Sequence, residues 1–331
     1  MTPPHFWQVE DGREAAPLTR ALLTPLSWLY AEVTARKIAA AAPVDPGAPV
    51  ICIGNLTVGG AGKTPVVRAI RAALVAAGVP ATVLSRGHGG RLKGPIAVDP
   101  SLHEAADVGD EPLLHAADGP AVIARDRLAG ARAAVAAGAR AIVMDDGHQN
   151  PSLAKALSLV VVDAQAGWGN GRVVPAGPLR EPVIAGLARA DAVILMRGGP
   201  QEVAAERPDL PTDAPVLEAW LEPVSAPPPG AWVAFCGIGR PAKFEATLRE
   251  LGLEPIHFAV FPDHHPYSGG DMERLRRLAS ADNARLLTTE KDKVRVPARF
   301  RPVVETVKVA VRFADPAVLD ALLAPVIEAA R

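Results

Sequence analysis

The sequence predicts an α/β fold, in which a mostly parallel sheet is flanked by helices and a smaller second α/β domain follows. Short apolar runs typical of buried strands alternate with helical patterns over most of the chain. Its 331 residues are enough for two domains of ordinary size, and a proline-rich break at 227–230 marks the boundary. The expected parts are an N-terminal amphipathic segment 1–40, a first domain 41–212, a linker 213–230 with room for one strand at 216–221, and a C-terminal domain 231–331.

The composition limits the class of partner and the compartment. With a formal net charge of −1, no overall field draws the chain to nucleic acid, and we expect no nucleic-acid partner. The N-terminus lacks a basic stretch followed by an apolar core, so no secretory signal is predicted. No run of about twenty residues is uniformly apolar, so no membrane span is expected. Cys52 and Cys236 lie in apolar strand-like runs, which favours buried free thiols in a reducing, cytoplasmic compartment.

A glycine-rich loop after the apolar run 49–53 is the strongest functional signal in the chain. It ends in Gly62-Lys63-Thr64, and a helical pattern follows at once. Glycines let backbone N–H groups converge on an anion, and the following helix points its positive end at the same place. In a P-loop the lysine reaches the outer phosphates and the threonine hydroxyl ligates Mg²⁺. The expected nucleotide contacts are Thr57, Gly59, Gly60, Ala61, Gly62, Lys63 and Thr64.

This loop departs from the P-loop pattern at one position. The pattern has glycine five positions before Gly62, where this chain has Thr57. The alternative is an ordinary glycine-rich turn between a strand and a helix. The strand pattern before the loop and the helix pattern after it favour the P-loop, so we predict a first domain of the P-loop NTPase type.

Two pairs of carboxylates could act on bound phosphates. Asp110 and Glu111 lie at a predicted helix start, where acidic residues are common as caps. One of them could instead accept a proton from an attacking hydroxyl. The predicted strand 139–144 ends in Asp145-Asp146, a pattern typical of a Walker B element, which holds Mg²⁺ directly or through water. The alternative for this pair is an Asp-Gly turn after a strand.

Three further segments carry polar groups whose role the pattern leaves open. The glycine- and proline-rich loop 167–182 is long for a compact domain, and such loops are usually functional. Arg127 opens a predicted helix and is either a solvated charge or a phosphate clamp. In Asp263-His264-His265, a histidine oriented against a catalytic carboxylate is favoured over a structural zinc site, because no further soft ligands lie nearby in the sequence.

Residues 15–40 combine apolar, aromatic and basic side chains in a helical pattern. Pro25 is expected to kink this segment or to start a second helix. One interpretation is a helix in a membrane interface, with Trp28 and Tyr30 at headgroup level and basic residues beside anionic lipid. The other is a helix packed on the protein's own core, which the segment by itself favours.

A series of short strings occurs in a fixed order along the chain: GNLTVGGAGKTP, SRGHGG, VGDEP, VMDDG, NGRVVPAGPLREP, GIGRP, FPDHHPY and TTEKD. The series resembles the tetraacyldisaccharide 4′-kinase family, the lipid A 4′-kinases of Gram-negative envelope synthesis. The resemblance extends to about Lys293, and Thr57 is part of it. It implies ATP- and magnesium-dependent phosphorylation of the 4′-hydroxyl of a tetraacylated, 1-phosphorylated glucosamine disaccharide, which gives lipid IV-A.

The resemblance also implies roles for individual residues. Asp110 in VGDEP would be the general base, assisted by His264 in FPDHH. Lys63 and Thr64 would serve the nucleotide and the metal. The others would surround these groups, with Asp145, Asp146 and Glu181 around Mg²⁺ and with Arg127 and Arg180 around the phosphates.

Two positions depart from the family pattern. The family usually has a histidine where this chain has Asn150, and His148 stands earlier in the same string. Any role of the final histidine is therefore open here. In the SRGHGG string, His88 stands where the family usually has tyrosine.

The implied acceptor is an amphiphile whose acyl chains stay in the bilayer. This favours the interfacial interpretation of residues 15–40, with the protein bound peripherally on the cytoplasmic face of the inner membrane. Two alternative functions are considered: a P-loop ATPase or GTPase switch acting on a protein partner, and a soluble small-molecule P-loop kinase. The switch gives no reason for the PAGPLREP string or for the amphipathic N-terminus.

Overall fold

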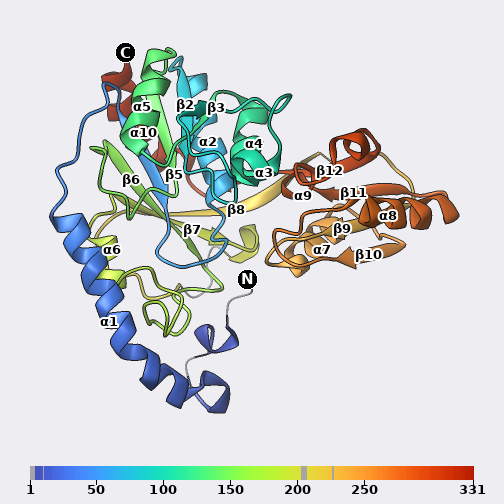
Figure 1. Ribbon diagram of the computed structural model, residues 1–331, viewed down its shortest axis with the longest axis horizontal. Coiled ribbons are helices and arrows are strands. Elements are labelled where there is room, and N and C mark those ends of the chain that lie inside the picture. The colour runs from blue at the N-terminus through green and yellow to red at the C-terminus, as the bar shows by residue number, and fades with distance from the viewer. Residues whose placement is uncertain (1–3, 10, 203–206, 226) are drawn as a thin grey trace.

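The computed structural model describes residues 4–9, 11–202, 207–225 and 227–331, which form an α/β molecule on one continuous twelve-stranded sheet (Figure 1). The strand order is β10-β9-β11-β12-β8-β7-β6-β1-β5-β2-β4-β3. Neighbouring strands are parallel except in the pairs β3–β4 and β8–β12. This confirms the predicted fold class, a large and mostly parallel sheet flanked by helices.

The bounds of the elements follow. The strands are β1 (Val50–Gly54), β2 (Ala81–Ser85), β3 (Ile96–Ala97), β4 (Ala121–Ile123), β5 (Ala141–Asp145), β6 (Leu157–Asp163), β7 (Ala192–Arg197), β8 (Val216–Ser225), β9 (Trp232–Cys236), β10 (His257–Val260), β11 (Arg285–Thr289) and β12 (Val304–Phe313). The α-helices are α1 (Pro17–Ala39), α2 (Lys63–Ala76), α3 (Ala105–Val108), α4 (Asp110–Asp118), α5 (Arg127–Ala136), α6 (Val183–Leu187), α7 (Pro241–Glu250), α8 (Gly269–Ala281), α9 (Glu290–Lys293) and α10 (Pro316–Ala330). Short 3₁₀ segments lie at His5–Trp7, Arg13–Ala15, Pro200–Glu202 and Ala298–Val303.

Strand β1 lies inside the first part of the sheet and is buried on both faces. Ile51 and Ile53 pack into a core with α2 and α10, whereas Val50 and Cys52 pack on the opposite face against α5. Parallel strands covered by helices on both faces have such uniformly apolar sequences. Because β1 and β5 pair in parallel, their carboxyl ends are adjacent. The predicted P-loop follows β1, and Asp145 ends β5 with Asp146 directly after it.

The second part of the sheet is joined to the first through β8 and β12, each ten residues long and paired antiparallel. Helix α8 covers one face of β9 and β11, and α7 covers the other. The proposed linker 213–230 thus contains a strand of the sheet, and α10 packs in the same core as α2. The division into domains stays a prediction. Strand β8 and helix α10 connect the expected C-terminal domain to the first one.

Three local features differ from the sequence prediction or refine it. Pro25 does not start a second helix, because α1 runs through it from Pro17 to Ala39. The segment 288–293, which contains the TTEKD string, completes β11 and forms the short helix α9, whose N-terminus the Thr289 hydroxyl caps. Cys52 and Cys236 are buried free thiols, as predicted.

Candidate active site

The loop between β1 and α2 has backbone features expected of a phosphate cradle. Gly59 and Gly62 have φ of 121° and 87°, a conformation that side chains disfavour. The fully buried Asn55 organises the loop from within, because its Nδ2 donates to the carbonyl of Thr57 at 2.7 Å. Lys63 is the first residue of α2, so the positive end of that helix faces the loop. The strand, loop and helix that the P-loop assignment required are therefore present.

The PAGPLREP string braces this loop from outside. The amide of Val58 donates to the carbonyl of Pro178 at 2.7 Å, and the amide of Arg180 donates to the carbonyl of Leu56, also at 2.7 Å. The side chain of Leu56 is fully buried in the core beneath this contact. Two strings that lie more than a hundred residues apart in the chain thus form one surface of the site.

Lys63 and Arg180 converge on Asp146. Nζ of Lys63 donates to Oδ1 of Asn55 at 2.9 Å and lies 3.5 Å from Oδ1 of Asp146. The Arg180 guanidinium donates to the same oxygen of Asp146 at 2.8 Å. Burial favours the neutral acid, but the two cations outweigh it and lower the pKa of Asp146 below its ordinary value. Asp146 is therefore an anion placed between two cations.

Asp145 belongs to a second, more deeply buried cluster. Its Oδ2 lies 3.0 Å from Nε2 of His115, and among the described residues its Oδ1 has no hydrogen-bond partner. Nearby, the Thr64 hydroxyl donates to Oε1 of Glu111 at 3.4 Å. Burial, together with the negative charge of Asp145, raises the pKa of Glu111. Such a concentration of acidic oxygens beside a P-loop threonine favours a cation.

Asp110 and His264 come together across the two parts of the sheet. Oδ2 of Asp110 lies 2.9 Å from Nδ1 of His264 and 3.7 Å from Nε of Arg295. Burial acts to raise the pKa of the Asp110 carboxyl. The neighbouring His264, Lys291 and Arg295 outweigh burial and hold this pKa at about 2. Asp110 is therefore an ionised carboxylate at neutral pH, oriented by a histidine.

The remaining groups around this pair come from FPDHHPY and TTEKD. Lys291 places Nζ 3.4 Å from Nε2 of His264 and 3.9 Å from Oε1 of Glu111. His265, the neighbour of His264, turns away and lies 3.2 Å from Oδ2 of Asp271. Of these two adjacent histidines, His264 contacts Asp110, whereas His265 contacts Asp271.

Glu181 and Arg127 are buried in contacts of their own. Both oxygens of Glu181 accept hydrogen bonds from Arg189, at 2.8 and 2.7 Å, and Oε1 also accepts from Gln149 at 3.0 Å. The guanidinium of Arg127 donates to the carbonyl of Ala124, and burial lowers its pKa. Glu181 thus meets the site through Gln149, whose amide also donates to the carbonyl of the P-loop's Asn55.

The two residues that depart from the family's DDG string have structural contacts. His148 is buried, with Nε2 2.9 Å from the carbonyl of Gly186 and Nδ1 3.2 Å from the hydroxyl of Ser158. Burial lowers the pKa of His148 to about 4. Asn150 closes a local turn, because its Oδ1 accepts from the amide and the hydroxyl of Ser152.

Several residues of the site carried no sequence prediction. The TTEKD string and the asparagine directly after a strand were visible signals for some of them. His115 and Arg189 gave no signal, because each is an isolated residue in an ordinary helical or loop sequence. The residues are Asn55, His115, Gln149, Arg189, Lys291 and Arg295.

A P-loop that faces a histidine-oriented carboxylate defines a class, a nucleotide-dependent kinase with an alcohol acceptor. Comparison with known proteins narrows this class. The family model described as LpxK, tetraacyldisaccharide-1-P 4′-kinase, matches residues 19–328. A tetraacyldisaccharide 4′-kinase of Phenylobacterium zucineum is 54% identical and covers 98% of both chains. One from Caulobacter vibrioides is also 54% identical and covers 97% of both chains.

A solved structure gives the same result. The fold is similar to that of the "apo" form of LpxK from Aquifex aeolicus in complex with ATP, with a TM-score of 0.75 and 26% identity. The match covers 93% of this chain and 99% of that one. The chain belongs to the tetraacyldisaccharide 4′-kinase family. The predicted resemblance and the lipid A 4′-kinase activity are thereby confirmed, and neither alternative function is favoured.

Two negative findings concern metal and membrane. Within the described residues, no group of three or more His, Cys, Asp or Glu side chains is arranged to hold a metal ion. No helix in the described part of the chain has both the length and the apolar character that a membrane span requires.

Proposed function

We propose that the chain transfers the γ-phosphoryl group of ATP, bound with Mg²⁺, to the 4′-hydroxyl of a tetraacyldisaccharide 1-phosphate at a membrane surface. The observation that carries this proposal is that the two parts of the sheet contribute residues to one site. The P-loop with Lys63 and Asp146 belongs to the first part of the sheet, and His264 reaches Asp110 from the second part. The family membership and the ATP complex of the Aquifex aeolicus relative support ATP as the donor.

The nucleotide phosphates lie, in this proposal, against the loop 57–64. Lys63 and Arg180 already bracket one anion, Asp146, so both cations are in place to stabilise negative charge on the transferred group. Arg127 stands at the start of α5, where it is buried and positions the end of β4 through the carbonyl of Ala124. Gln149 connects the loop to Glu181.

Because the described residues offer no ready-made set of three acidic ligands, Mg²⁺ would bind beside Thr64 together with the nucleotide. Oδ1 of Asp145, which is buried and has no hydrogen-bond partner among the described residues, is an oxygen of the kind that this cation prefers, and Glu111 and the Thr64 hydroxyl lie nearby. Asp146, which contacts Lys63 and Arg180, would act on the waters of the ion. Mg²⁺ commonly binds through one or two carboxylates and completes its shell with water and phosphate oxygens. Once bound, the ion would neutralise charge on the phosphates. Glu181 would act from further out, because Arg189 occupies both of its oxygens.

Asp110 would accept the proton of the 4′-hydroxyl. The acceptor oxygen forms a bond to the γ-phosphorus, the bond to the β,γ-bridging oxygen breaks, and ADP leaves. A carboxylate with a pKa of about 2 is a weak base, but the transition state of phosphoryl transfer is loose. The hydroxyl becomes strongly acidic only as its oxygen bonds to phosphorus, so orientation by His264 matters more than basicity. The low pKa then returns the proton readily to solvent.

Helix α1 would hold the enzyme on the membrane. Leu18, Leu22, Leu26, Leu29 and Val33 are exposed and recur at the three- and four-residue spacing that places them on one face. A continuous apolar stripe of this kind on a surface helix suits a lipid interface, and the basic residues of its last turn suit anionic headgroups. Because ATP is supplied from the cytoplasm, this surface would be the cytoplasmic face of the inner membrane.

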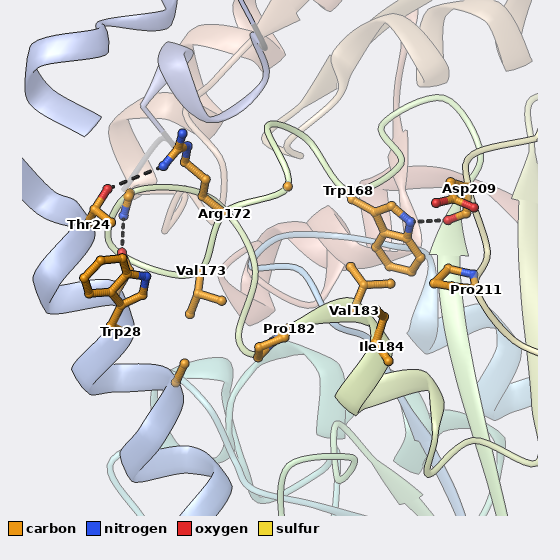
Figure 2. Close-up of a pocket in the computed structure, with 14 residues that line it drawn as sticks. Thr24, Trp28, Trp168, Arg172, Val173, Pro182, Val183, Ile184, Asp209 and Pro211 are labelled. Carbon is orange, nitrogen blue, oxygen red and sulfur yellow. Dashed lines mark hydrogen bonds between the residues drawn. The ribbon is translucent and has the colours of Figure 1, made fainter. Parts of the chain in front are cut away.

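A cavity between α1 and the segment 168–184 would receive part of the acceptor. Figure 2 shows Trp28 on one side and Trp168, Val183 and Ile184 on the other. Its volume of about 530 Å³ is typical of a ligand site, and its lining is mainly apolar. On α1 the cavity is lined by Thr24, Ser27, Trp28 and Ala31, which lie on the helix face away from the leucine stripe, so an acyl chain in it would leave the bilayer and pass around the helix.

The test incubates the full chain and ATP labelled in the γ-phosphate with two acceptors, the tetraacyldisaccharide 1-phosphate and a soluble sugar. Label in the tetraacyldisaccharide 1-phosphate, dependent on Mg²⁺, is the expected result. Label in a soluble sugar with none in the lipid, or release as free phosphate alone, would contradict the proposal. A variant with Lys63→Met, which removes the phosphate-binding cation, serves as the inactive control.

A further inference from the structure

His115 is a fully buried residue to which the chemistry above gives no role. It lies on α4, and its Nε2 is 3.0 Å from Oδ2 of Asp145 at the end of β5. An ionised carboxylate only accepts hydrogen bonds, so the Nε2–H of His115 donates. The contact therefore fixes both the imidazole and the carboxylate in one orientation.

Each partner of this contact keeps one buried atom unpaired. Within the described chain, neither Nδ1 of His115 nor Oδ1 of Asp145 has a hydrogen-bond partner. A purely apolar side chain would fill the position of His115 without burying an unpaired nitrogen, which is unfavourable. Packing alone thus gives no reason for a histidine here, whereas a hydrogen bond to Asp145 does.

His115 also contacts the elements that carry the proposed nucleotide, base and metal residues. The guanidinium of Arg71, on α2, donates to the carbonyl of His115 at 2.8 Å. Helix α2 begins with Lys63, and α4 begins with Asp110. The imidazole of His115 thus connects the helix of the proposed base to the strand of the proposed metal carboxylate.

We propose that His115 is a positioning residue that holds one oxygen of Asp145 so that the other faces the Mg²⁺ of the bound nucleotide. This inference rests on the proposed function, because it takes Asp145 as a ligand of Mg²⁺ or of its waters. Hydrogen bonds from outside a metal site orient its ligands, and their loss commonly weakens metal binding by about 10- to 100-fold.

Two matched amide variants test the inference. In His115→Gln the side-chain nitrogen can take the place of Nε2 and still donate to Asp145, whereas the shorter amide of His115→Asn cannot reach it. The readout is binding of a fluorescent, non-hydrolysable ATP analogue during a Mg²⁺ titration, recorded together with Tm. His115→Asn is expected to raise the half-saturating Mg²⁺ concentration at least about tenfold, and His115→Gln by less than about threefold. Binding without Mg²⁺ should be the same in all three proteins.

The outcomes separate the inference from the proposed function. A wild-type Mg²⁺ titration in His115→Asn, with only Tm lowered, overturns the inference and leaves His115 as a packing residue. If the wild-type chain binds the analogue equally well with and without Mg²⁺, the metal in the proposed function is wrong instead. Should His115→Asn not fold, His115→Met fills the same space without a donor and carries the same expected shift.

Discussion

Replacing two leucines of the α1 stripe should weaken membrane binding by about two orders of magnitude. Leu18 and Leu22 are 86% and 79% exposed in the folded chain. Complete transfer of one leucine side chain from water to an apolar environment contributes about 2 kcal/mol. Scaling by the exposed fractions gives about 3 kcal/mol for the pair, and each 1.4 kcal/mol is a factor of about ten. The variant Leu18→Ser/Leu22→Ser should therefore bind vesicles about 100-fold more weakly.

The assay is cosedimentation with sucrose-loaded vesicles of mixed neutral and anionic phospholipid over a range of lipid concentrations. The control is Leu102→Ser, which removes a leucine that is 76% exposed but lies outside α1. It should bind as the wild type does, and both variants should keep the wild-type Tm, because none of the three leucines is buried. Wild-type binding by the double variant, or an equal loss in the control, would refute the role given to α1.

Three further predictions concern the site. Asp110→Asn should lower kcat by about 10²- to 10⁴-fold and leave the affinity for an ATP analogue unchanged; ordinary turnover would remove Asp110 from the role of base. Burial acts to raise the Asp110 pKa, but His264 and neighbouring cations hold it at about 2, so its stabilisation is complete above about pH 4 and lost as pH falls through about 2. His264→Ala should move that loss to higher pH in urea unfolding curves, and an unshifted profile would contradict the pairing. Ile184→Trp, which fills the cavity beside Trp28, should raise KM about tenfold for the tetraacylated acceptor but not for ATP, and an equal rise for both would argue against the cavity as an acyl site.

Those parts of the site that depend on local backbone chemistry could be predicted from the sequence. The loop before Lys63 needs glycines because two of its residues adopt positive φ. These glycines stand next to Lys63 in the sequence, so the requirement can be recognised there. Asp145 and Asp146 close an apolar run that predicts a strand, and this strand is β5, which pairs with β1. In both cases, residues that are close in the sequence are also close in the folded site.

Contacts between distant segments could not be predicted in this way. The pairing of Glu181 with Arg189 depends on the turn that α6 makes, and His115 meets Asp145 only because α4 packs against α2 and β4 in the folded chain. Pro25 was expected to kink the segment or to start a second helix, and the second of these is wrong because α1 continues through it. The strand predicted at 216–221 within the linker is the first part of β8, but its continuation through Pro223 to Ser225 and its pairing with β12 could not be predicted, because the partner strand lies far along the chain.

The brace between PAGPLREP and the P-loop has a consequence for inhibition. The same short segment touches α1 at one end, where the amide of Ala176 donates to the Ser27 hydroxyl, and the P-loop at the other, through Pro178 and Val58. A compound lodged in the cavity that displaced this segment would alter the loop without occupying the nucleotide site. By thermodynamic reciprocity, bound ATP would change the affinity for that compound by the same factor. If the altered loop binds ATP less tightly, bound ATP weakens the compound to the same extent but does not exclude it from the cavity.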